Sequence, residues 1–584
     1  MTGGERSSRK VPRGRLAAAA DRLAAFTAAR ARPATGFVHQ PEPRSIGSFA
    51  RGRQLVAGNF LFAGFLVEGK DLSIWDLAMP DPSFEEVLHG CTWLDDLAAV
   101  GDRPARERAQ AWVFDWVVRF GAGKGPGWTP DLTGRRLIRM INHAPFLLSG
   151  RDKAQAEAFF RVLGGQTLFL ARRWRSASPG LPRFEALTGL VYASLALTGM
   201  ERHAGPAAEA LAAECAVQVD AGGGIPTRNP EELLEVFTLL IWAVEAIEGA
   251  GRTPLPAHLA AISRIAPTLR ALRHADGGLA RFHGGGRGLP GRLDAALAAS
   301  GTRAGPPQGL AMGFGRLHAG RSTLIIDAAA PPAGAASANA HASTLAFELT
   351  SGRWPLIVSC GSGAMFGPDW HRAGRATPSH STLGLEGYSS SRLGPATRRG
   401  AQMRTWLEEI PSEVWMRPES DPARHALFGH DGYLATHGLT HIRELELAQD
   451  GNGLTGTDSL GAMTSSDKAR LEAVLEAGGY RGIPYQIRFH LHPDVDAALD
   501  MGGWAVSMVL KSGEIWVFRF DAPVELSLEP SVYLEKGRLR PRATQQIVLS
   551  GRLLDPIAQI GWTLAKAHDT PDANRDPVPP PPDR

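Results

Sequence analysis

Cysteine is scarce in this chain, with three residues among 584. Cys91, Cys215 and Cys360 lie far apart, and none belongs to a CxxC pair. An odd number of widely spaced cysteines excludes a disulfide framework and a cysteine-based metal site. We therefore expect all three cysteines to be small, buried side chains.

The chain also lacks a large excess of charge of either sign. Its 63 lysine and arginine residues nearly balance its 59 aspartate and glutamate residues, and the formal net charge is +4. Nucleic-acid-binding domains usually carry a strongly basic face, so the sequence predicts no nucleic-acid partner. A local basic groove for an anionic ligand remains compatible with this balance.

Long apolar runs are absent as well. No stretch of about 18 apolar residues exists, so the sequence predicts no transmembrane segment. The basic N-terminal region has an alanine-rich stretch, but Asp21 and Arg22 interrupt it and leave no apolar core for a secretory signal. These absences predict a cytoplasmic or peripheral protein.

The spacing of apolar residues changes along the chain. From about residue 102 to about residue 271, apolar residues recur at helical spacing in segments separated by Gly- and Pro-containing loops. Later, short apolar or alternating runs lie between turn signals, which indicates an antiparallel sandwich. We predict four parts: a basic, partly disordered arm (1–47), a helical domain (48–312), a β-sandwich domain (313–566) and a disordered Pro-rich tail (567–584).

Two histidines stand where strands are predicted to begin. His341 opens HASTLAFEL, and His380 opens HSTLGLEG. If the first strand is regular, His341 and Phe347 share one of its faces. Two histidines that meet at one end of a sandwich would suit metal ligation or proton transfer. Two separate, satisfied surface histidines are the alternative that the spacing leaves open.

The same region resembles a known family. The residues that carry the resemblance are NAHASTLAFELTSGRWPLIVSCGSG, which begins at Asn339, then RATPSHSTLGLEG, RFHLHPD and GEIWVFRF. With the helical half before them, they resemble the heparinase II/III-like polysaccharide lyases over about residues 50 to 560. The resemblance implies an incomplete α/α toroid followed by an antiparallel β-sandwich. It also implies a place in the cell envelope or periplasm, if this chain follows the family.

The resemblance implies cleavage of an acidic, uronic-acid-containing glycan by β-elimination. In that reaction a base removes the C5 proton, an acid protonates the departing O4, and hydrogen-bond donors stabilise the carboxylate. His341, His380 and Asn339 match positions at the family's site. Tyr388 follows this motif closely and is a candidate proton shuttle, with packing in a turn as its alternative role.

The family also holds a structural metal ion through two histidines and an aspartate. His341 and His380 match the two histidine ligands, but Ser359 stands at the aspartate position in PLIVSCG. Serine is a poor metal ligand. We therefore expect no required cofactor and at most weakly bound zinc.

Several basic and amide side chains are candidates for binding a carboxylated sugar. Arg139, Asn142 and His143 lie close together on a predicted amphipathic helix. Arg139 and Asn142 are three residues apart and share a face of that helix. The alternative is that these polar groups pack between helices.

Three further arginines lie in predicted loops. Arg228 precedes a helix whose first turn Asn229 is expected to cap. Arg281 lies with His283 in a glycine-rich loop that could close over a ligand. Arg375 is the preferred carboxylate clamp, because a guanidinium group binds a carboxylate through two parallel hydrogen bonds.

These residues lead to a polysaccharide lyase that acts on an acidic glycan. The alternative is a non-catalytic glycan-binding or envelope-assembly protein that retains the lyase fold. The alternative is favoured by Ser359, and by the absence of the family's Asn-His pair and tyrosine at the nearest equivalent helical positions. A glycoside hydrolase ranks last, because its chemistry needs two carboxylates across a cleft and no such pair is evident. The sequence gives no oligomeric state.

Overall fold

The computed structural model describes residues 15–32, 34–70, 72–399, 402–419 and 421–568. Most of the predicted tail and the first part of the predicted arm lie outside these residues. The chain divides into two compact units. The first comprises Met1–Gln218, Glu235–Ile262 and Ala396–Arg404, and the second comprises Val219–Leu234, Ser263–Pro395 and Thr405–Arg584.

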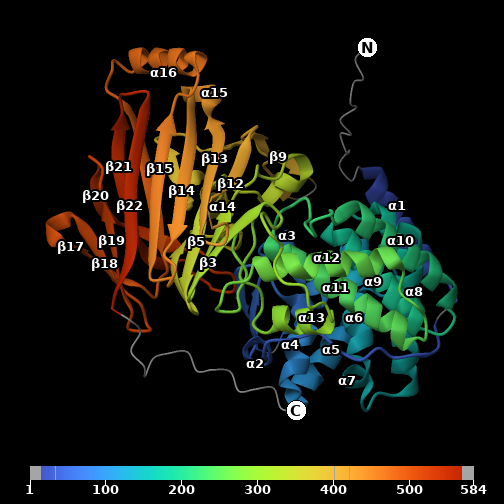
Figure 1. Cartoon of the computed structure of the whole chain (residues 1–584). Coiled ribbons are helices and arrows are strands. Elements are labelled where there is room, and N and C mark those ends of the chain that lie inside the picture. Colours follow the sequence, from blue (N-terminus) through green and yellow to red (C-terminus); the bar gives the residue numbers. More distant parts are fainter. Residues whose placement is uncertain (1–14, 33, 71, 400–401, 420, 569–584) are drawn as a thin grey trace, which may run out of the picture. The chain divides into compact units, whose positions relative to one another are not determined.

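The first unit is helical, as predicted (Figure 1). The helical spacing of the sequence corresponds to α5 (Arg103–Phe120), α6 (Pro130–Asn142), α8 (Lys153–Arg173) and α9 (Leu181–Ala196). The other helices are α1 (Arg15–Ala28), α2 (Phe49–Val56), α3 (Pro82–Gly90), α4 (Trp93–Val100), α7 (Ala144–Leu148) and α10 (Ala204–Gln218). Two more, α11 (Pro230–Gly249) and α12 (Pro256–Ala271), contain residues of both units.

Local sequence signals explain where these helices begin. Asp152 and Gln155 form a capping box at the start of α8. The segment after α2 forms the antiparallel hairpin β1 (Asn59–Phe62) and β2 (Phe65–Glu68).

α6 and α9 pack closely because each carries a glycine at their contact. A Cβ atom on Gly189 would lie 2.4 Å from the Gly134 Cα, and one on Gly134 would lie 2.2 Å from the Glu185 carbonyl oxygen. A residue with a side chain would separate the two helices. This contact fixes the position of α6, which carries Arg139 and Asn142.

The second unit contains two eight-stranded antiparallel sheets (Figure 1). One has the order β12-β13-β14-β15-β22-β19-β18-β17, and the other has the order β20-β21-β16-β6-β5-β4-β3, with β7 paired to β16. The strands of the first sheet are β12 (Val414–Pro418), β13 (His425–Tyr433), β14 (Leu439–Leu447), β15 (Gly453–Gly461), β17 (Asp496–Asp500), β18 (Ala505–Val509), β19 (Ile515–Phe520) and β22 (Ile557–His568). Those of the second are β3 (Phe314–Ala319), β4 (Ser322–Asp327), β5 (Phe347–Ser351), β6 (Trp354–Val358), β7 (Leu383–Leu385), β16 (Ile483–Leu491), β20 (Glu525–Tyr533) and β21 (Arg542–Leu553).

One apolar core holds both sheets together. Phe347 of β5 stacks on Trp562 of β22, with ring centroids 6.0 Å apart and planes 6° apart. Phe489 of β16 packs edge-on against the same tryptophan at 4.8 Å. These contacts join strands of different sheets, so the predicted β-sandwich is confirmed. Three helices, α14 (Pro368–Gly374), α15 (Leu434–His437) and α16 (Ser465–Ala477), lie between these strands in the chain, and α13 (Arg292–Ala299) precedes β3.

The structure bears on two expectations, which concern the three cysteines and the long apolar runs. Cys91, Cys215 and Cys360 are all buried and carry free thiols, as predicted. In the part of the chain that the structure describes, no helix has the length and apolar character needed to span a membrane.

Candidate functional site

The two central histidines lie in loops of the second unit. Residues 341–346 form no strand, and β5 begins only at Phe347. Leu345 has a φ angle of 59°, a left-handed conformation that an extended strand cannot contain. The prediction that a strand begins at His341 is therefore wrong, and the condition of a regular strand from His341 to Phe347 is not met, because a turn separates the two residues. His380 directly follows the short 3-10 helix η6 (Thr377–Ser379), and β7 begins only at Leu383.

The loops nevertheless bring the histidines together, as the family resemblance implies and as the spacing alone left open. The ring centroids of His341 and His380 are 5.0 Å apart. A third imidazole, that of His283, lies 5.9 Å from His341. All three side chains are buried, with 0–1% of their surface exposed. We call His283, His341 and His380 the histidine cluster.

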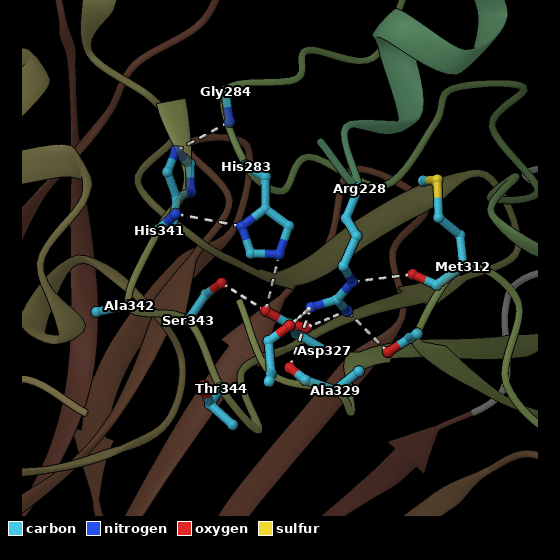
Figure 2. A network of polar contacts seen from close by, with 12 residues as sticks. Arg228, His283, Gly284, Met312, Asp327, Ala329, His341, Ala342, Ser343 and Thr344 are labelled. Carbon is cyan, nitrogen blue, oxygen red and sulfur yellow. Dashed lines mark hydrogen bonds and ion pairs between the residues drawn. The ribbon is translucent and has the colours of Figure 1, made fainter. Parts of the chain in front are cut away.

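Hydrogen bonds fix the orientation of His283 and His341 (Figure 2). The Gly284 N–H donates to His341 Nε2 (3.0 Å), and the His341 N–H donates to His283 Nδ1 (3.2 Å). Because His283 Nδ1 accepts, its Nε2 carries the proton and faces Asp327 Oδ2 at 3.3 Å. The cluster therefore ends at a buried carboxylate.

That carboxylate is held by an arginine that the sequence suggested for substrate binding. Arg228 Nη2 donates to Asp327 Oδ1 (2.6 Å), and Ser343 Oγ donates to Asp327 Oδ2 (2.7 Å). Burial alone would raise the pKa of Asp327, but Arg228, His283 and Ser343 together hold it below its ordinary value. The remaining Arg228 hydrogen bonds go to the carbonyls of Met312, Gly313, Ala329 and Ala330.

Burial also controls the charge of the histidines. It lowers the pKa of His380 to about 3, with a smaller contribution from His490. Burial and the neighbouring His380 hold the pKa of His341 well below its ordinary value. Both rings are therefore neutral at neutral pH, and neither can donate a proton as an imidazolium ion there.

Arg375, the predicted carboxylate clamp, binds the protein's own backbone. Its Nε donates to the Ala340 carbonyl (2.7 Å), its Nη1 to Thr405 (2.9 Å) and its Nη2 to Ser337 (2.8 Å). The side chain is 2% exposed. These contacts support a structural role, in which Arg375 holds the segment that leads into His341.

Asn339 and Tyr388 are the predicted catalytic residues that reach solvent. Asn339 is exposed at the end of the 3-10 helix η4 (Gly334–Asn339). Tyr388 is 41% exposed and packs edge-on against His437, with ring centroids 4.6 Å apart. The packing that was the alternative role of Tyr388 is therefore present.

The residues around the histidine cluster do not form a complete metal site. Ser359 Oγ and both ring nitrogens of His380 are buried and have no hydrogen-bond partner among the described residues. His341 Nε2 already accepts from Gly284. Within the described ranges, no group of three or more His, Cys, Asp and Glu side chains could hold a metal ion. The donor set thus does not fit a tightly bound metal.

The candidates of the helical half form a separate group in the first unit. Asp95 Oδ2 accepts from Arg139 Nε (3.2 Å), and Asp95 Oδ1 lies 2.9 Å from His143 Nε2. Although burial would raise the pKa of Asp95, Arg139 and His143 lower it to about 2. Asn142 is fully buried, and neither polar atom of its side chain has a partner among the described residues. Asn142 is therefore the one unsatisfied candidate in this group.

The remaining two predictions concern Asn229 and Arg281. Asn229 Oδ1 accepts from the N–H groups of Glu231 (3.0 Å) and Glu232 (3.2 Å), so the predicted helix cap is confirmed. Arg281 does not belong to the histidine cluster, although His283, two residues later in the chain, does. Arg281 Nη2 instead donates to the Ser359 carbonyl (2.8 Å).

Known proteins extend this description. A sequence profile described as "Heparinase II/III-like, C-terminal" matches residues 301–563. FtsZ-localized protein C of Caulobacter vibrioides is 32% identical over 539 residues, which cover 90% of this chain and 89% of the relative. The chain belongs to the heparinase II/III-like family.

Solved structures agree with this family at the level of the fold. A heparinase III structure matches with a TM-score of 0.65 and 11% identity, and the match covers 93% of this chain and 89% of that chain. The heparan sulfate lyase HepC of Pedobacter heparinus, solved as a mutant, matches with a TM-score of 0.55 and 14% identity, over 95% and 89% of the two chains. The predicted toroid-plus-sandwich architecture of this heparinase II/III-like protein is thus confirmed.

Proposed function

We propose that this heparinase II/III-like protein is a non-catalytic glycan-binding protein that retains the lyase fold and localises with FtsZ. One observation carries the proposal: the imidazoles at the family's site are buried, and the neighbouring arginines are bound to the protein itself. A catalyst must contact its substrate, and these groups have no surface with which to do so.

β-Elimination requires three chemical functions. The base must reach the C5 proton, and His341 Nε2 instead accepts a backbone N–H. The carboxylate needs donors, and the three guanidinium nitrogens of Arg375 are all bound to carbonyls. Asn339 reaches solvent but cannot act as a base, and so Tyr388 is the predicted catalytic residue that is both exposed and able to transfer a proton.

The relative from Caulobacter vibrioides supports the second half of the proposal. Its name states that it is localised with FtsZ, and it aligns with nine tenths of this chain. An assembly role needs the fold and its surface, and not an open catalytic site. Localisation with FtsZ, as proposed here, would require no transmembrane helix.

The second candidate function is a polysaccharide lyase that acts on an acidic, uronic-acid-containing glycan. The likeness to heparinase III and to HepC supports it, because the fold of both covers most of this chain. In that case the loops over His341 and His380 would have to open when the glycan binds.

An absorbance assay separates the two candidates, because β-elimination creates a conjugated unsaturated sugar. The full chain is incubated with heparan sulfate, chondroitin sulfate, alginate and polyglucuronate, with an active heparinase as positive control. We expect no rise in ultraviolet absorbance and no new chain ends, although at least one polymer co-sediments with the protein. A rise that is abolished in His380→Ala would establish the lyase.

Localisation is tested separately with a fluorescent fusion in the native host. We expect the fusion to follow labelled FtsZ through the cell cycle, and His380→Ala to do the same. A uniform distribution of the wild-type fusion would contradict the proposed association.

A further inference from the structure

A second group of polar side chains lines a small cavity in the second unit. Its volume is about 40 Å³. No member of the histidine cluster lines it. The polar and charged residues that line it include His274, Arg281, Glu348, Thr350, His492 and Tyr533, together with Asp276, Arg287 and Glu535.

Glu348 is the centre of this wall and is 3% exposed. Its Oε2 lies 3.1 Å from His274 Nε2 and accepts the Arg281 N–H at 3.2 Å. Its Oε1 lies 3.4 Å from Arg281 Nε. A carboxylate can only accept, so His274 Nε2 carries the proton and Nδ1 is an acceptor in the neutral ring.

Two atoms of this wall, His274 Nδ1 and Thr350 Oγ1, are buried without a hydrogen-bond partner among the described residues. Glu348 Oε1 accepts no hydrogen bond there, and its ion pair with Arg281 Nε is 3.4 Å long. The carboxylate oxygen and the neutral imidazole nitrogen can only accept, and the threonine hydroxyl can donate or accept. Buried acceptors without partners are costly in a folded protein, so a ligand that donates hydrogen bonds would satisfy them.

The other side chains of the cavity supply donors and an aromatic surface. The Arg281 guanidinium lies 4.1 Å from the centroid of the Tyr533 ring. The same ring packs edge-on against His492, with centroids 5.0 Å apart. Burial lowers the pKa of His492 to about 4, so this ring is uncharged at neutral pH.

The charges of the cavity are balanced. Arg281 pairs with Glu348, and Arg287 pairs with Asp276 at 3.0 Å. Glu535, which also lines the cavity, pairs with an arginine on its own turn at 3.1 Å. A bound anion would therefore meet the carboxylate of Glu348, and a bound cation would meet the guanidinium of Arg281. Both are disfavoured in a buried site, whereas a neutral group that donates and accepts is not.

We propose that this cavity binds the hydroxyl groups along one edge of a sugar. Sugar hydroxyls donate and accept at the same time, which matches acceptors at Glu348 and His274 and donors at Arg281 and Tyr533. A volume of about 40 Å³ accommodates roughly three waters. It therefore admits an adjacent pair of hydroxyls or a hydroxymethyl group, and the rest of the ring lies outside. The inference rests on the proposed glycan binding and names its point of contact.

Saturation-transfer NMR on the full chain tests this site. The probes are the methyl glycosides of glucose, galactose, N-acetylglucosamine and glucuronic acid, followed by the monodeoxy forms of the best binder. We expect at least one probe to bind, and removal of one or two adjacent hydroxyls to weaken binding about fivefold, the effect of one lost hydrogen bond.

Thr350→Val is the decisive variant, because it removes an unsatisfied hydroxyl and keeps the side-chain shape. We expect it to remain folded and to bind the best probe about fivefold more weakly. Thr188→Val in α9 is the matched control, since Thr188 is equally buried, also lacks a partner among the described residues and does not line the cavity. The control should bind like the wild type.

Three results would overturn the inference. They are no saturation transfer to any of the four probes, unchanged affinity in Thr350→Val, and binding of sulfate or ammonium in place of every sugar. Co-sedimentation with a glycan polymer distinguishes the two proposals. If a polymer binds equally to the wild type and to Thr350→Val, the cavity is not the binding site and the proposed function still holds. If the wild type binds no polymer, the proposed function itself is contradicted.

Discussion

His380 is the residue at which burial and chemistry conflict most directly. A proton-transfer residue needs access to its substrate and a pKa near the working pH. His380 is fully buried, and its two ring nitrogens have no partner among the described residues. Burial of this imidazole therefore carries a cost in the folded state, which lowers its pKa.

This burial predicts a pH dependence of stability. The pKa of His380 is about 3 in the folded chain, against an ordinary value of 6.5. Between these values the unfolded chain binds the additional proton, so stability increases with pH there. The free energy of unfolding should be highest above about pH 6.5 and should fall, on the order of a few kcal/mol, as the pH approaches 3.

Urea titrations at about pH 7.5 and about pH 5 measure this effect. His380→Asn should lose less stability between the two pH values than the wild type, because one buried imidazole is removed. His318→Asn is the control, since His318 is exposed on β3, and it should keep the wild-type difference. Equal differences in all three proteins would show that burial of His380 does not set the pH dependence.

A second prediction at this scale concerns Ser359. Its hydroxyl is buried without a partner among the described residues, at the position where the family resemblance places an aspartate. We propose that the wild type retains less than one equivalent of zinc after dialysis. Ser359→Asp should retain more, because aspartate supplies the carboxylate ligand that the family resemblance implies at this position. Elemental analysis measures both, with the uncharged Ser359→Asn as control. One tightly held zinc in the wild type would mean that another side chain completes the site.

At the scale of elements, β14 holds both histidine loops in place through one arginine. Arg443 Nη1 donates to the carbonyls of Leu345 (2.8 Å) and Ser381 (3.0 Å). The other side of the guanidinium forms two hydrogen bonds to Asp458, from Nε at 2.7 Å and from Nη2 at 3.0 Å. All these side-chain atoms are buried, so the loops depend on an ion pair inside the sandwich.

We predict that Arg443→Met loosens both loops together. The substitution leaves Asp458 buried beside His441 without its arginine, which costs about 3–5 kcal/mol of stability. Hydrogen exchange should become faster in residues 339–347 and 378–385, measured by mass spectrometry. Arg424→Met is the control, because Arg424 forms a partly exposed pair worth less than about 1 kcal/mol. Faster exchange in only one loop would mean that Arg443 does not couple them.

The elements also show how far the sequence could predict this site. Period and turn signals were sufficient for the long helices and for β3 to β6, whereas the meeting of His341 with His380 followed from the family resemblance and not from spacing. They failed at residues 341–346, because the left-handed Leu345 cannot be recognised from alternation. Asp327 was missed, although a charged residue that ends the apolar run STLIID was a usable signal. The separation of Arg281 from His283 depends on side-chain packing, which no local pattern encodes.

At the scale of the whole molecule, the family fold is present while the candidate catalytic histidines are buried. The heparinase architecture is retained across both parts of the chain, whereas the candidate catalytic groups are enclosed by their own loops. Selection for stability alone would favour apolar side chains in place of unsatisfied buried histidines. These buried imidazoles therefore cost stability that apolar side chains in their place would not.

The overall charge gives the last prediction. A net charge of +4 provides little long-range attraction to polyanions, so contacts with DNA should be weak and sensitive to salt. We expect no saturable binding of duplex DNA at about 200 mM salt, whereas glycan binding that depends on hydroxyl contacts should change little between about 50 and about 200 mM. Fluorescence anisotropy measures both.

Deletion of residues 1–14, which removes four basic side chains and one acidic side chain, serves as the matched variant. The deletion should reduce DNA binding at low salt and leave glycan binding unchanged. Loss of glycan binding on deletion or at higher salt would mean that the glycan is bound through charge and not through the cavity.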